Sequence, residues 1–71
     1  MQKTLYQMAK EYVDVLNELE KTDDPLKATS LEEQRILLHG LFIDALNEQG
    51  IKFKDREHAT RIAIRIAAEE L

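Results

Sequence analysis

A chain of 71 residues that contains no cysteine has to hold its fold together without disulfides. A domain of this size buries only about 60% of the surface that its unfolded chain exposes, so its core supplies only a few kcal/mol. Small domains often add a structural metal instead, but the spacing of potential ligands offers none here. Two routes to stability remain: well-packed helices, or association with a second copy of the chain.

Hydrophobic periodicity predicts one all-α domain, residues 1–71, which contains three helices. The first helix is expected over residues 3–21, where the apolar side chains fill an arc of about 180° and charged side chains lie opposite. The segment "TDDPLKATS" follows and is expected to be a linker, because proline does not fit a helix interior. Asp24 and Pro25 could open one short turn within it.

The second helix is predicted over residues 31–49. Ser30 and Glu33 form a capping-box pattern at its start, and Gly50 suits the left-handed conformation that ends a helix. Its inner face is predicted to consist of apolar residues at helical spacing, with Leu37 at the margin: Leu31, Leu38, Leu41, Phe42, Ala45 and Leu46.

The last segment, "RIAIRIAAEEL", fits two structures. Its isoleucines alternate with other residues as in a half-buried strand, whereas the alanines and glutamates around them favour a helix. A single strand has no partner and is not stable, and Asp55 is a suitable N-cap. We therefore predict a helix over residues 56–70, preceded by an extended connector from which Ile51 and Phe53 point inward.

Two of the three helices carry more apolar surface than one core contact requires. Wrapped as a helix, residues 56–70 show an apolar arc of about 240°, with Ile64 about 200° from Ile62. One explanation is a central helix packed between the other two; the one we favour is a second chain. The predicted interface combines a seam on the second helix with the far side of the third: Ile36, Gly40, Ile43, Ile64, Ala68 and Leu71.

A cluster of basic residues supports an alternative function, the binding of a nucleic acid. Lysine and arginine neutralise phosphates, and Phe53 could stack on a base. Against this, Glu57–Arg61 and Arg65–Glu69 have the i,i+4 spacing of ion pairs within a helix. The residues of this basic cluster are Lys52, Lys54, Arg56, Arg61 and Arg65.

The remaining residues argue against several other functions. His39 and His58 have no partners at the spacing of a known metal site, and no phosphate-binding or catalytic motif is present, so we expect no enzyme activity, metal or cofactor. The net charge of −4 disfavours bulk attraction to nucleic acid or anionic membranes. No apolar run approaches the length of a membrane span, and we expect a cytoplasmic protein.

The first predicted helix, "TLYQMAKEYVDVLNELE", resembles the N-terminus of a family of siphovirus phage and prophage accessory proteins. The resemblance covers about residues 4–20 and assigns no functional residue. It implies a mobile-element origin. Together with the apolar surface, it leads us to expect a non-enzymatic, homodimeric module that also binds an unidentified protein.

Overall fold

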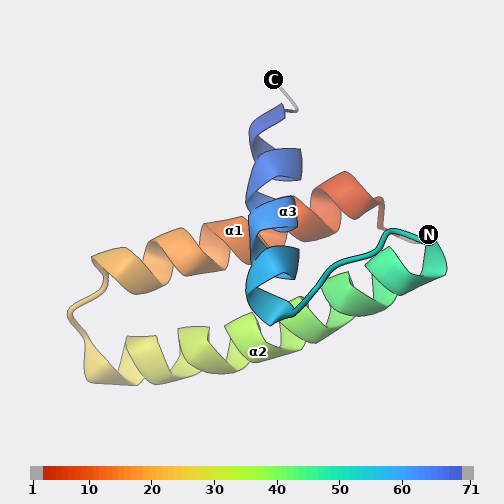
Figure 1. Ribbon diagram of the computed structural model, residues 1–71. Helices are drawn as coiled ribbons and strands as arrows, with labels where there is room; N and C mark the ends of the chain where they lie inside the picture. The colour runs from red at the N-terminus through yellow and green to blue at the C-terminus, as the bar shows by residue number, and fades with distance from the viewer. Residues whose placement is uncertain (1–2, 70–71) are drawn as a thin grey trace.

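The computed structural model describes residues 3–69, which form three helices and no strand: α1 (Leu5–Lys21), α2 (Pro25–Glu48) and α3 (Arg56–Glu69). The predicted all-α, three-helix fold is therefore confirmed. α1 and α2 lie side by side and run in opposite directions, and α3 crosses α1 steeply (Figure 1). The alternating isoleucines of the last segment belong to a helix, as predicted.

The start of α2 differs from the prediction by six residues. Asp24 is the N-cap, its Oδ1 accepting a hydrogen bond from the Leu26 amide at 3.0 Å, and Pro25 occupies the first turn. Proline is well suited to that position, because its missing N–H would have no helical partner there. The capping box predicted at Ser30 is therefore wrong: Ser30 lies inside α2, and the linker shortens to residues 22–24.

A capping box does form, but at the start of α1. The Thr4 hydroxyl accepts a hydrogen bond from the Gln7 amide at 3.1 Å, and the Gln7 side chain accepts one from the Thr4 amide at 3.0 Å. These two bonds satisfy backbone donors that have no partner inside the helix.

The connection from α2 to α3 follows the sequence-based expectation. Gly50 has a φ of 72°, and the Ile51 amide donates to the Leu46 carbonyl at 2.9 Å. Ile51 and Phe53 then turn back and pack against the core. Asp55 caps α3, with its Oδ1 accepting a hydrogen bond from the His58 amide at 2.8 Å. The predicted roles of Gly50 and Asp55 are confirmed.

The core lies where the three helices meet. Its largest fully buried side chains are Tyr12, Phe42 and Leu46. α3 packs mainly against α1, and its two fully buried residues are Ala59 and Ala63. Because alanine has a short side chain, the two helices can approach closely. α3 is therefore held by small contacts at its centre, with larger side chains packed around them.

Candidate protein interface

One side chain from each helix, together with a backbone carbonyl of α3, forms a polar junction in the core. The rings of Tyr12 and His39 stack with their centroids 5.1 Å apart, and the Tyr12 hydroxyl lies 3.0 Å from Thr60 Oγ1. Thr60 Oγ1 donates to the Arg56 carbonyl at 3.1 Å, and His39 Nε2 lies 3.3 Å from the same oxygen. No buried side-chain polar atom among residues 3–69 lacks a partner. We infer that this junction orients α3 on the α1–α2 pair.

The junction makes stability depend on pH. Burial lowers the pKa of His39 below its usual 6.5, and the positive charges of Arg56 and Arg35 lower it further, whereas the bond to the Arg56 carbonyl opposes the shift. The unfolded chain then takes up a proton at a higher pH than the folded one. We expect the free energy of unfolding, measured by urea denaturation, to be fully retained above pH 6.5 and to fall as the pH decreases through the lowered pKa.

The matched control for this pH effect is His39→Phe. It keeps an aromatic ring for Tyr12 to stack on, but it removes the group that titrates. We expect the unfolding free energy of this variant to depend less on pH in the same window, with His58 unchanged in both proteins. An identical pH dependence in the two proteins would contradict the assignment to His39.

Two neighbouring rows of residues on α2, Ile36 with Gly40 and Leu37 with Leu41, lie largely outside the core. The fractional exposures are 59% for Ile36, 64% for Leu37 and 46% for Leu41, and Gly40 lies among them. We call these four residues the outer α2 face. Leu41 was predicted to lie inside, and that prediction is wrong. Apolar residues are spread almost evenly around α2, so periodicity alone does not select the buried side.

His39, and not Leu41, lies on the buried side of α2, with only 6% of its surface exposed. A histidine can be buried there because Tyr12, Thr60 and the Arg56 carbonyl surround it with suitable partners. These partners come from other helices, so no local pattern in α2 reveals them. The structural role of His39 was therefore not predicted, and the sequence had suggested only a metal ligand without partners.

The residues of the predicted seam on α2 differ in their exposure. Ile36 and Gly40 are exposed, whereas Ile43 is half-buried and packs against the core. A Cβ atom added at Gly40 would meet nothing within 4 Å. The fold of the single chain therefore does not require glycine at this position, although glycine in a helix costs about 1 kcal/mol relative to alanine.

The far side of α3 is exposed, as expected if the other two helices do not cover it. Ile64 is 47% exposed and Ala68 is also exposed, while Ile62 and Ile66 pack against the core. Arg61 and Arg65 lie on the same side of the helix. We call Ile64 and Ala68, with these two arginines, the outer α3 face. Leu71, the last residue of the predicted interface, lies outside the described residues.

The two outer faces do not form one continuous surface. The outer α2 face is on the side of α2 that points away from the core, whereas the C-terminal half of α3 extends past α1, on the side remote from α2 (Figure 1). The half of α3 that carries Ile64 and Ala68 therefore lies beyond α1 as seen from α2, which carries Ile36 and Gly40. We treat the two faces as separate surfaces.

All five residues of the basic cluster are exposed, but they are not all on one side. Arg56 and Arg61 are five residues apart, which is about 140° around a helix. Arg61 pairs with Glu57 at 3.1 Å, as predicted. The predicted pair between Arg65 and Glu69 is not formed within residues 3–69. Phe53 packs against the core, so its ring is not free to stack on a base.

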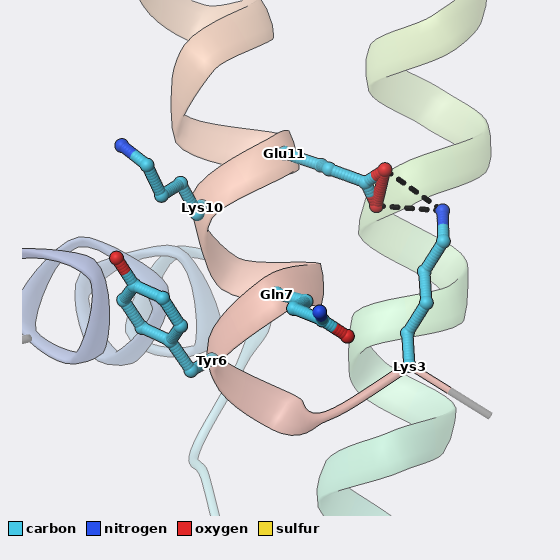
Figure 2. Close-up of a pocket in the computed structure, with 5 residues that line it drawn as sticks. All are labelled: Lys3, Tyr6, Gln7, Lys10 and Glu11. Atoms are coloured by element: carbon cyan, nitrogen blue, oxygen red, sulfur yellow. Dashed lines mark hydrogen bonds and ion pairs between the residues drawn. The ribbon is translucent and has the colours of Figure 1, made fainter. Parts of the chain in front are cut away.

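A shallow depression beside the N-terminal half of α1 offers no obvious chemistry. Figure 2 shows Lys3 extended along α1 to Glu11, whose carboxylate oxygens are both 2.8 Å from the Lys3 Nζ. Tyr6 and Lys10 lie on another side of the helix, and Gln7 belongs to the capping box. Within residues 3–69, no three histidine or acidic side chains are grouped to hold a metal ion.

Comparisons with other proteins do not assign this chain to a family. No family model, curated protein or solved structure gives a significant match. Across residues 3–69, none of the helices has both the length and the apolar character needed to cross a membrane. The resemblance to siphovirus accessory proteins stays a prediction.

Proposed function

We propose that this protein is a small non-enzymatic interaction module that self-associates, as an accessory or regulatory protein of a phage-type element would. The observation that carries the proposal is the outer α2 face. Three large aliphatic side chains, Ile36, Leu37 and Leu41, are exposed by 46–64% around a glycine that the single chain does not need.

The size of the domain makes this face costly to leave uncovered. Burying an isoleucine or leucine side chain contributes roughly 1.5–3 kcal/mol relative to full exposure. A domain of 71 residues has a small core and no disulfide, so such a contribution is a large share of its stability. A second copy of the chain is the partner that is always available at the same concentration.

Leu37→Lys tests the proposal. Leu37 is the most exposed member of the outer α2 face, and a lysine there lies one helical turn after Glu33, with which it can pair. We expect the wild type to sediment as a dimer or larger at micromolar concentration. The variant should keep its helicity and weaken association at least tenfold, which corresponds to about 1.4 kcal/mol.

The matched control is Asn17→Lys, which introduces the same charge at an exposed position of α1. It should leave association unchanged. A wild type that stays monomeric at high concentration would refute self-association. A Leu37→Lys variant that associates like the wild type would instead show that association does not use the outer α2 face.

Nucleic-acid binding through the basic cluster is the alternative. It is favoured by the exposure of Lys52, Lys54 and Arg65, none of which has an ion-pair partner within residues 3–69. Binding to phosphates weakens steeply as salt is raised, because counterions are released, whereas apolar helix docking does not. Salt-sensitive binding of DNA or RNA that is lost when Arg61 and Arg65 are replaced by glutamine would support this alternative.

A further inference from the structure

We propose that copies of the chain associate head to tail, with the outer α2 face of one copy bound to the outer α3 face of the next. This inference rests on the self-association proposed above and adds which two surfaces meet. Both surfaces expose aliphatic side chains, but they differ in the charges beside them and in their position on the domain.

The charges favour unlike faces over like faces. Glu33 and Asp44 are exposed and lie at helical spacing beside the outer α2 face. Arg61 and Arg65 belong to the outer α3 face. Pairing two outer α2 faces would bring four carboxylates into one small interface, and juxtaposed like charges are costly. Pairing the α2 face with the α3 face places carboxylates opposite arginines.

The same bias holds over the surrounding segments. α2 carries four acidic and two basic side chains, whereas residues 52–69 carry five basic and three acidic ones. Only one of those basic side chains, Arg61, forms an ion pair within residues 3–69. The region around α3 therefore has positive charge left over for an acidic neighbour.

The side-chain sizes on the two faces also suit this pairing. Gly40 leaves an open position on α2 among Ile36, Leu37 and Leu41, where an added Cβ would meet nothing within 4 Å. Ile64 is 47% exposed and is flanked along α3 by the small Ala68. The Ile64 side chain of one copy would then fill the open space at Gly40 of the next copy, in the manner of ridges packing into grooves.

The positions of the two faces on the domain favour two different neighbours over a closed pair that uses both faces at once. The outer α2 face points away from the core, and the outer α3 face lies on the half of α3 that extends beyond α1 (Figure 1). Each copy then binds one neighbour through α2 and another through α3. Contacts of this heterologous kind produce rings or open filaments rather than a two-fold dimer.

A mixing experiment with two single variants tests the arrangement. Leu37→Lys blocks the outer α2 face and leaves α3 intact, whereas Ile64→Glu blocks the outer α3 face and leaves α2 intact. Each charge repels the face that it would meet. We expect each variant to sediment as a monomer at a concentration where the wild type is oligomeric. An equimolar mixture should recover association through the remaining pair of unmodified faces, the α3 face of Leu37→Lys and the α2 face of Ile64→Glu.

The outcomes separate this inference from the proposed function. If Ile64→Glu associates like the wild type and does not bind Leu37→Lys, the interface is formed by two α2 faces, and the head-to-tail arrangement is wrong while self-association stands. If the wild type is monomeric throughout, both are wrong. Circular dichroism of each variant checks that its helicity is retained. Ala68→Ser serves as a mild control substitution on the same α3 face.

Discussion

Replacing Tyr12 with alanine is expected to lower the free energy of unfolding by about 3–5 kcal/mol, the range found for removing a large aromatic side chain from a core. The substitution removes the ring that stacks on His39 and the hydroxyl that contacts Thr60. Tyr12 is only 2% exposed, so water does not fill its place without cost. Urea denaturation followed by circular dichroism measures the change.

Tyr12→Phe separates the ring from its hydroxyl. It keeps the stacking on His39, and Thr60 keeps its hydrogen bond to the Arg56 carbonyl. We expect a loss of only about 1 kcal/mol, the typical contribution of one hydrogen bond. If the phenylalanine variant were as unstable as the alanine variant, the hydroxyl rather than the ring would be the main contribution of Tyr12.

Replacing Ala63 with leucine is expected to cost about 1–3 kcal/mol, because extra methyl groups in a well-packed core force neighbouring groups apart. Ala63 is fully buried where α3 packs on α1, and no larger side chain fits without moving one helix. The same substitution at Ala68 is the control. Ala68 is exposed, so its replacement should change stability by no more than about 0.5 kcal/mol.

These stability measurements require the monomeric state, since association stabilises the folded chain by mass action. They are best made in the Leu37→Lys background, at a concentration where that variant sediments as a single species. If Ala63→Leu were as stable as its parent there, α3 would not pack on α1 through this alanine.

The sequence allowed the fold class, the end of α2 and the start of α3 to be predicted. Each depends on local chemistry: Gly50 reaches a positive φ without steric cost, and Asp55 supplies a carboxylate to a free amide. The start of α2 was harder because two valid start signals lie six residues apart. Asp24–Pro25 initiates the helix, and Ser30 is accommodated inside it.

The buried side of α2 could not be predicted in this way. With apolar residues almost all around the helix, the choice between Leu41 and His39 depends on what the other helices place opposite them. Tyr12 lies 27 positions before His39, and Thr60 lies 21 positions after it. Only the folded chain brings these partners together, so the polar junction leaves no local trace in the sequence.

The candidate interface was predictable in kind but not in detail. Surplus apolar surface on the second and third helices was visible from their wide arcs, and Ile36 and Ile64 are indeed exposed. Which neighbouring residues share that surface depends on how each helix is rotated. Leu37 is therefore exposed on it, whereas Ile43 packs against the core. The separation of the two faces follows from the crossing of α3 over α1 (Figure 1).

The position of Tyr12 also gives the protein an internal optical reporter. The sequence contains no tryptophan and only two tyrosines, so the near-ultraviolet signal comes chiefly from these two rings. Tyr6 is half-buried in the first turn of α1, whereas Tyr12 is buried where the three helices meet. Near-ultraviolet dichroism requires fixed aromatic packing, while far-ultraviolet dichroism requires only helices. In a Tyr6→Phe background, the near-ultraviolet spectrum would therefore follow the packing of the three helices around Tyr12. The far-ultraviolet spectrum would follow the formation of the helices.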